Sequence, residues 1–170
     1  MKAEYIDHLG SDLTVVNAAR VSMDKHHAVF REGDTKLLKY LATHNHWTPF
    51  SHPQITMRET VPIFVARQRF KHMVGFTYNE VSRRYVDDTP EFYTPDVWRS
   101  RPEGSIKQGS GDKEVTRLVD EDEYGCKYYE YTSNEYQAYL RAAEHIYNLM
   151  LKNGVAPEQA RMVLPQSMYT

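Results

Sequence analysis

The sequence predicts an α+β fold (mixed α and β) in a single domain over residues 1–170, with an antiparallel sheet flanked by helices. Two segments alternate apolar and polar residues with the period of strands, and several others have the period of helices. The two kinds do not follow one another as βαβ units, which favours α+β. With 170 residues, of which 41% are hydrophobic, and a net charge of −2, the chain is long and apolar enough to bury a core.

The N-terminal quarter is predicted to contain one strand and two helices. Residues 3–9 alternate weakly between apolar and polar side chains, as a strand does. Residues 11–23 begin with Ser11 or Asp12 as a helix-capping residue and continue with apolar residues near helical spacing. Residues 34–44 place three leucines on one side, which predicts a second short helix.

A second strand and a buried helix are predicted next. Residues 53–61 alternate as a strand, and Pro62 fits the first turn of a helix over 60–72, where its missing N–H costs no hydrogen bond. The first half of this helix is apolar on all sides and is expected to be buried. Its far end carries one adjoining polar face made of Arg67, Gln68, Lys71 and His72.

The region from 86 to 128 is rich in Asp, Glu, Gly and Pro, and residues 101–114 are expected to form a mobile surface loop. No strand or helix is predicted there.

The C-terminal part is predicted to be helical. Residues 132–154 have the strongest helical period in the chain, with Thr132 and Glu135 as a capping box and Gly154 as the terminator. Residues 156–164 predict a last short helix, with a proline in its first turn.

Basic residues gather near the middle of the chain. If Gly75 turns the chain back toward the preceding helix, they converge on a phosphate, which arginine's planar fork suits. Glu80 supplies an acceptor for the N–H groups of a nucleobase or flavin. The basic residues are Arg67, Arg69, Lys71, Arg83 and Arg84, with His72 among them.

A second interpretation of the same cluster stays open. Lys71 and His72 complement the negative end of a helix dipole, and Arg83 and Arg84 alternate across an exposed strand. In that case the cluster is a solvated surface without a ligand.

Three histidines, His44, His46 and His52, raise the question of a metal site. Their spacing is wider than metal ligands usually have, and no carboxylate or cysteine is adjacent. A helix end followed by a turn at Thr48 is the favoured interpretation, and no metal site is predicted. Cys126, the only cysteine, has an acidic neighbourhood that disfavours a reactive thiolate.

The chain lacks the features of several other classes of protein. No apolar run approaches a membrane span, the N-terminus lacks the pattern of a signal peptide, and a single cysteine forms no internal disulfide. A cytoplasmic protein is expected. The near-neutral net charge argues against general nucleic-acid binding, although a small nucleic-acid-binding module using residues 67–84 stays an alternative.

Five motifs follow one another along the chain: AARVS (18–22), HNHWTPFSH (44–52), FVARQRFKH (64–72), NEVSRRY (79–85) and ARMVLP (160–165). They occur in the order found in flavin-dependent thymidylate synthases, and the chain resembles that family from about residue 13 to its last residue. The resemblance implies methylation of dUMP to dTMP, with methylenetetrahydrofolate as carbon donor, FAD as hydride carrier and NADPH as reductant. It also implies a homotetramer whose active sites lie between subunits.

The matched motifs imply roles for individual residues. The residues that resemble the family's cofactor contacts are Thr48, Lys71, His72, Met73 and Glu80, with His46 and Ser22 in motifs near flavin and folate. The residues that resemble the dUMP-binding set are Gln68, Lys71, Glu80, Ser82, Arg83, Arg84 and Arg161. Ser82 is assigned to substrate binding rather than to nucleophilic attack.

A first departure from the family pattern, in residues 71–79, qualifies these expectations. The triplet at 71–73 is Lys-His-Met instead of Arg-His-Arg, and the connection to Asn79 is one residue longer. The lysine keeps a charge without the guanidinium fork, and Met73 carries no charge.

The chain is also expected to be truncated at its C-terminus relative to the family. The arginine that polarises the uracil ring in the family lies beyond residue 170, so no catalytic residue is assigned. The chain is therefore expected to need a further segment or a second chain for activity, or to be a binding paralogue without catalysis. The last short helix is expected to lack packing partners.

Overall fold

The computed structural model describes residues 1–86, 88–104 and 109–170. The chain forms two compact units. The N-terminal unit contains Met1–Thr60 and Met73–Thr77, and the C-terminal unit contains Val61–His72 and Tyr78–Thr170. The helices and the antiparallel strands of both units confirm the predicted α+β class, whereas the single domain over 1–170 stays a prediction.

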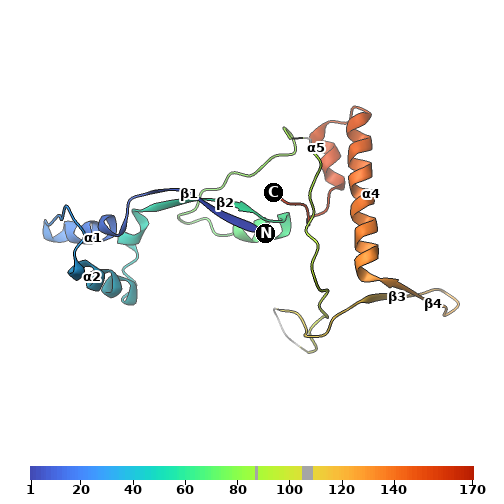
Figure 1. Ribbon diagram of the computed structural model, residues 1–170, viewed down its shortest axis with the longest axis horizontal. Coiled ribbons are helices and arrows are strands. Elements are labelled where there is room, and N and C mark those ends of the chain that lie inside the picture. Colours follow the sequence, from blue (N-terminus) through green and yellow to red (C-terminus); the bar gives the residue numbers. More distant parts are fainter. Residues whose placement is uncertain (87, 105–108) are drawn as a thin grey trace. The chain divides into compact units, whose positions relative to one another are not determined.

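The N-terminal unit contains the two predicted strands, β1 (Lys2–Leu9) and β2 (Gln54–Thr60), which pair antiparallel (Figure 1). Tyr5 lies opposite Met57, and the register shifts between Tyr5 and Asp7, which marks a β-bulge. Both strand predictions are therefore confirmed, to within two residues at each end.

The helices of the N-terminal unit are α1 (Asp12–Arg20) and α2 (Glu32–Thr43), followed by short 3-10 turns η1 (Val21–Met23) and η2 (Thr48–Ser51). Ser11 is the N-cap of α1, as predicted, and its backbone N–H donates to Thr14 Oγ1 at 3.0 Å. The apolar side chains Val15 and Val16 of α1 and Leu41 of α2 are buried, and the two helices contact each other.

A buried ion pair also joins these two helices. Arg20, the last residue of α1, bonds through its guanidinium to the carboxylate of Asp34, which is only 1% exposed. The backbone N–H of Arg31 donates to the second carboxylate oxygen at 2.8 Å. The hydrogen bond from Arg20, and then that from Arg31, hold the pKa of Asp34 below its ordinary value, although burial acts in the opposite direction.

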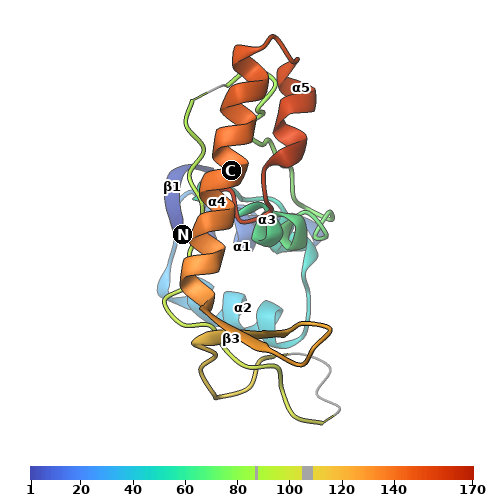
Figure 2. The same ribbon diagram turned by 90° about the vertical axis from the view of Figure 1, so that its right-hand side faces the viewer.

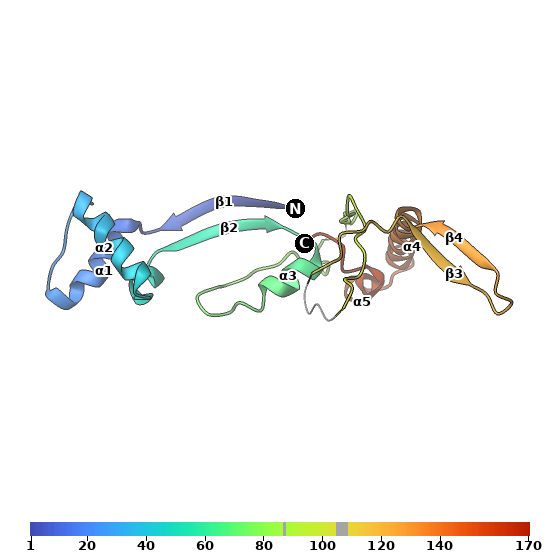
Figure 3. The same cartoon turned by 90° about the horizontal axis from the view of Figure 1, so that it is seen from below.

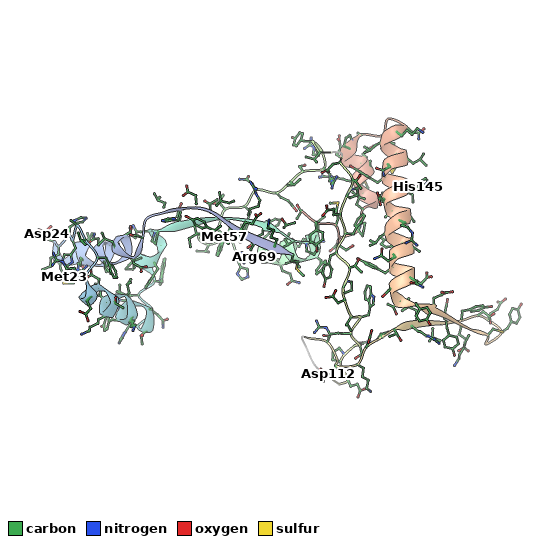
Figure 4. The ribbon with its side chains drawn as sticks, viewed as in Figure 1. Met23, Asp24, Met57, Arg69, Asp112 and His145 are labelled. Atoms are coloured by element: carbon green, nitrogen blue, oxygen red, sulfur yellow. The ribbon has the colours of Figure 1, made fainter. Side chains whose placement is uncertain are left out.

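The loop between α1 and α2 is held by a reciprocal pair of hydrogen bonds. The Asn17 amide donates to the His27 carbonyl at 2.9 Å, and the His27 N–H donates back to the Asn17 side-chain oxygen at 3.0 Å. The His27 ring nitrogen Nδ1 lies 3.8 Å from Asp34. Figure 4 labels Met23 and Asp24, where the loop begins and where Asp24 has a positive φ of 52°.

The C-terminal unit starts with α3 (Ile63–Arg69), whose N-cap is Pro62 rather than a proline within the first turn. Two of its first N–H groups find acceptors in the last residues of the chain: Ile63 donates to the Met168 carbonyl at 2.9 Å, and Phe64 donates to that of Gln166 at 3.0 Å. The apolar start of α3 is only partly buried, since Ala66 is buried and Phe64 is exposed.

The last five residues also pair with a second segment. Tyr169 donates to the Glu91 carbonyl at 2.9 Å, and Tyr93 donates to that of Ser167 at 2.8 Å. The C-terminal residues are thus held between residues 61–64 on one side and 91–93 on the other.

The long helix α4 (Thr132–Lys152) confirms the strongest helical prediction, and Gly154, which has a positive φ of 81°, follows its C-cap Asn153. The predicted capping box is wrong: the N-cap is Tyr131, and the Thr132 hydroxyl donates to the Val115 carbonyl at 3.1 Å. The hydroxyl, which accepts a backbone N–H in a capping box, instead donates to the carbonyl of a distant residue.

The last short helix, α5 (Pro157–Ala160), continues as η3 (Arg161–Val163) and lies beside α4 (Figure 2). Ala160 is fully buried, as is Tyr147 of α4. The expectation that this helix lacks packing partners is therefore wrong. Figure 4 shows His145 on the side of α4 that points away from α5.

A β-hairpin that the sequence analysis did not predict lies within residues 86–128 and just beyond. Strands β3 (Arg117–Glu121) and β4 (Lys127–Tyr131) pair antiparallel and lead directly into α4 (Figure 3). Both strands are exposed along their whole length, so neither shows the alternation of a half-buried strand.

The carboxylate of Asp122 organises the hairpin turn. It accepts the Cys126 N–H at 2.8 Å, the Tyr124 N–H at 3.0 Å and the Tyr128 hydroxyl at 2.9 Å. These bonds, with that from Cys126 first, lower the pKa of Asp122. The charge-assisted bonds explain how a short ribbon without a buried face keeps its turn.

Backbone pairing fixes the base of the predicted loop over 101–114. Ser100 donates to the Lys113 carbonyl at 2.7 Å, and Gly111 donates to that of Ser100 at 2.8 Å. Residues 105–108 of this predicted loop lie outside the described residues, as does residue 87. Within the described ranges, none of the helices has the length and apolar character that crossing a membrane requires.

We expect Asp34→Asn to lower the melting temperature and to flatten its acid dependence. Because the folded-state pKa of Asp34 lies below its ordinary 3.8, its ionised form stabilises the fold above that value, and this contribution is lost as the pH falls through the lower pKa. Thermal unfolding followed from neutral to acid pH measures both effects. Glu32→Gln, an exposed position on the same helix, is the control, and an equal loss in both variants would contradict the assignment.

Candidate functional site

Two of the residues predicted to contact a cofactor lie in one cavity of the N-terminal unit. The cavity has a volume of about 450 Å³, within the range of small-molecule sites. His46 and Thr48 line it. The complete lining is Ala18, Ala19, Leu41, Asn45, His46, Trp47, Thr48, Pro49 and His52.

The end of α2 positions these side chains. His46 donates its backbone N–H to the Leu41 carbonyl at 2.9 Å, and the intervening Asn45 has a positive φ of 56°. The Ser51 hydroxyl donates to the Thr48 carbonyl at 2.7 Å within η2. The helix end followed by a turn, predicted from the sequence, is confirmed.

The histidines of this motif take part in aromatic packing. His44 stacks on Tyr40 with ring centroids 4.0 Å apart, and His46 meets the same tyrosine edge-on at 5.9 Å. In the part of the chain that the structure describes, no three His, Cys, Asp or Glu side chains are grouped so as to hold a metal ion.

A second cavity of about 610 Å³ lies along α1 and the loop that follows it. It shares Ala18 and His52 with the first cavity and is also lined by His26 and His27. Sequence reasoning did not identify it, because the Asn17 clamp that holds the loop against α1 joins residues ten positions apart. Ser22, a predicted cofactor contact, lines neither cavity, and its hydroxyl donates to the Ala19 carbonyl at 3.2 Å.

The polar groups predicted around residues 67–72 lie at the end of α3. The prediction of one helical polar face is wrong, because α3 ends at Arg69 and Lys71 and His72 lie beyond it. Gln68 is exposed on the last turn of the helix, and Lys71 is exposed in the turn that follows.

Tyr78 fixes the chain after this turn. Its hydroxyl lies 3.1 Å from the carbonyl of Arg69 and 2.9 Å from that of His72, and its ring lies 5.1 Å from that of Phe70. Gly75 has a positive φ of 76°. The chain after Gly75 thus returns to the end of α3 at Tyr78, which is the condition that the sequence argument set.

The two neighbouring arginines lie in a turn over residues 82–85, so the alternative interpretation of an exposed strand is wrong. The Arg83 side chain is only 10% exposed, and its guanidinium donates to both the carbonyl and the carboxylate of Asp88, the latter at 2.6 Å. Arg84 is exposed and lies 5.8 Å from the ring of Tyr85.

Ser82 organises this turn. Its carbonyl accepts the Tyr85 N–H at 3.0 Å, and its hydroxyl lies 3.3 Å from the Arg84 N–H. Glu80 is exposed just before the turn, Met73 is exposed, and Arg161 is exposed in η3. The convergence of these groups on a single ligand stays a prediction.

Comparison with known proteins identifies the family. The profile of a family described as thymidylate synthase complementing protein matches residues 4–170. The flavin-dependent thymidylate synthase of Thermosipho africanus is 38% identical over 97% of this chain and 67% of its own length. That of Thermus thermophilus is 34% identical over 97% of this chain and 55% of its own length.

The chain therefore belongs to the family of the flavin-dependent thymidylate synthases. It spans about two thirds, or less, of the length of these relatives. A crystal structure of the UMP/dUMP methylase PolB from Streptomyces cacaoi, bound with 5-Br dUMP, has a similar fold. Its TM-score is 0.71 at 30% identity, over 99% of this chain and 69% of that one.

We expect Tyr78→Phe to destabilise the protein by about 0.5–1.5 kcal/mol, because the ring stays against Phe70 while the hydroxyl bond to the two carbonyls is lost. Denaturant unfolding measures the change. Tyr139→Phe, at an exposed position on α4, is the control. Equal stabilities of Tyr78→Phe and the parent protein would show that the hydroxyl does not hold this turn.

Proposed function

We propose that the protein converts dUMP to dTMP by reductive methylation. The family match over residues 4–170 carries this proposal. The names of the relatives and the similar fold of a dUMP methylase support it. Because the chain spans only part of its relatives' length, the proposal concerns the protein that contains it.

We propose FAD as the cofactor. The lining of the cavity at η2 supports this proposal, since it combines apolar side chains of Leu41 and Pro49 with the hydrogen-bonding residues His46 and Thr48. When bound, FAD supplies a hydride, with NADPH as its reductant and methylenetetrahydrofolate as carbon donor. The other proposed cofactor contacts are Ser22, Lys71, His72, Met73 and Glu80.

The proposed dUMP contacts are of two kinds. Cationic side chains bind the phosphate, and groups with lone pairs or amide N–H groups orient the uracil ring. The cations are Lys71, Arg83, Arg84 and Arg161, and the orienting groups are Gln68, Glu80 and Ser82.

The guanidinium groups of the two arginines in the turn have different surroundings before a ligand binds. Arg84 presents an exposed guanidinium, whereas a phosphate that binds Arg83 has to exchange with Asp88 or share the guanidinium with it. Ser82 acts as a positioning residue for Arg84, because its hydroxyl and carbonyl accept backbone N–H groups of the turn.

We propose that the protein works in the cytoplasm as a homotetramer with active sites shared between subunits. This proposal comes from the resemblance to the family.

The direct test uses the purified full-length protein. We expect the visible absorbance bands of an oxidised flavin, and formation of dTMP from dUMP only when methylenetetrahydrofolate and NADPH are both present. Bound flavin without dTMP formation would show that the protein binds the cofactor but does not catalyse the reaction, which would overturn the proposed activity. Absence of flavin, with steeply salt-dependent binding to RNA or DNA, would replace the proposal by nucleic-acid binding.

We expect Arg84→Ala to weaken dUMP binding about tenfold or more, because the substitution removes a charge-assisted hydrogen bond. Isothermal titration of dUMP into the flavin-loaded protein measures the dissociation constant. Arg141→Ala, which removes an exposed guanidinium from α4, is the matched control. A dissociation constant unchanged by Arg84→Ala would make Arg84 an ordinary surface charge.

A further inference from the structure

The hairpin β3–β4 has two faces of different chemistry. The front face carries Arg117, Val119 and Glu121 of β3 and their cross-strand neighbours Tyr131, Tyr129 and Lys127 of β4. The rear face carries Leu118 and Asp120 of β3 opposite Glu130 and Tyr128 of β4. This division follows from the register, because residues paired across the strands share a face and the next residues point the other way.

Side-chain contacts confirm the composition of the front face. The guanidinium of Arg117 lies 5.1 Å from the centre of the Tyr131 ring and donates to its hydroxyl at 3.3 Å. At the turn end, the Lys127 ammonium lies 3.9 Å from the Glu121 carboxylate. Val119 and Tyr129 fill the middle of the face.

This middle is apolar and exposed. Val119 keeps 59% of its surface in contact with solvent, and Tyr129 and Tyr131 are similarly exposed. A two-stranded ribbon of this length is marginal in water unless one face is covered. The exposed centre, flanked by charges, therefore has the composition of an interface with an apolar core and a polar rim.

The charges indicate what covers the front face. Cations and an anion lie at its two ends, so a second copy stacked front to front meets opposite or neutral groups. With the two-fold axis across the strands, Arg117 faces the partner's Glu121 and Lys127 faces the partner's Tyr131. With the axis along the strands, Glu121 faces the partner's Lys127, and Arg117 faces the partner's Tyr131.

The rear face lacks this charge complementarity. Its two charged side chains, Asp120 and Glu130, are both acidic. The same two axes set Asp120 and Glu130 of one rear face against Leu118 and Tyr128 of the other, so stacking two rear faces places four carboxylates in the interface without an opposite charge, which disfavours this pairing. The front face therefore offers ion pairs to a second copy, whereas the rear face offers only unpaired acids.

We propose that the front face of the β3–β4 hairpin is an interface between two copies of this chain, stacked face to face about a two-fold axis. Val119 and Tyr129 form its apolar centre, and the Arg117, Glu121 and Lys127 charges align the two ribbons. This inference stands on the hairpin alone, and it holds whether or not the protein methylates dUMP.

Matched arginine substitutions on the two faces test the proposal. In the full-length protein, Val119→Arg adds a cation to the centre of the front face, and Leu118→Arg adds the same group to the rear face one residue away. Both positions are exposed, so neither substitution disturbs a core. Sedimentation velocity over a range of protein concentrations is expected to show association at least about tenfold weaker for Val119→Arg and nearly unchanged for Leu118→Arg.

A photo-crosslink gives a second measurement that does not depend on the strength of association. Benzoylphenylalanine at position 119 is expected to produce a covalent dimer joined through the hairpin of a second copy. At position 118 the same group is expected to produce no such dimer. The proposal is overturned by a protein that is monomeric at every concentration. It is also overturned by equal effects of the two arginines, or by crosslinks to another part of the chain.

Discussion

Backbone pairing by the last five residues is the constraint on which the C-terminal unit depends. These residues accept hydrogen bonds from the first N–H groups of α3, and they exchange further bonds with residues 61 and 91–93. Because Pro62 offers no side-chain cap, the carbonyls of Gln166 and Met168 perform the capping of α3. The position of α3, and hence of the polar groups at its far end, is set by a chain segment that is distant in sequence.

The same unit shows how short polar segments are held without regular secondary structure. Tyr78 bonds to carbonyls at the end of α3, and Ser82 closes the turn that carries the two arginines. Each of these contacts satisfies backbone groups that neither a helix nor a sheet pairs. The arrangement leaves Arg84 exposed while Arg83 is held by Asp88, so neighbouring residues of one motif have different surroundings.

In the N-terminal unit the corresponding constraint is the ion pair of Arg20 with Asp34. Arg20 belongs to the AARVS motif, yet its guanidinium contacts a buried carboxylate of the next helix. This contact fixes the end of α1 against the start of α2, and α1 also contacts η2, where His46 and Thr48 line a cavity. A motif shared with a family therefore contains both residues that shape the site and residues that are proposed to touch its ligands.

Much of the fold and part of the site were predictable from the sequence, because they depend on neighbours within about one turn of helix or one strand. Alternation predicted β1 and β2, the helical period predicted α1, α2, α4 and α5, and the motifs in order predicted the family. Only tertiary structure decided that α3 stops at Arg69, that Thr132 bonds to Val115 instead of capping α4, and that an exposed hairpin precedes α4. The physical reason is the same in each case: the hydrogen-bonding partner or the paired strand comes from another segment of the chain, and local periodicity carries no information about it.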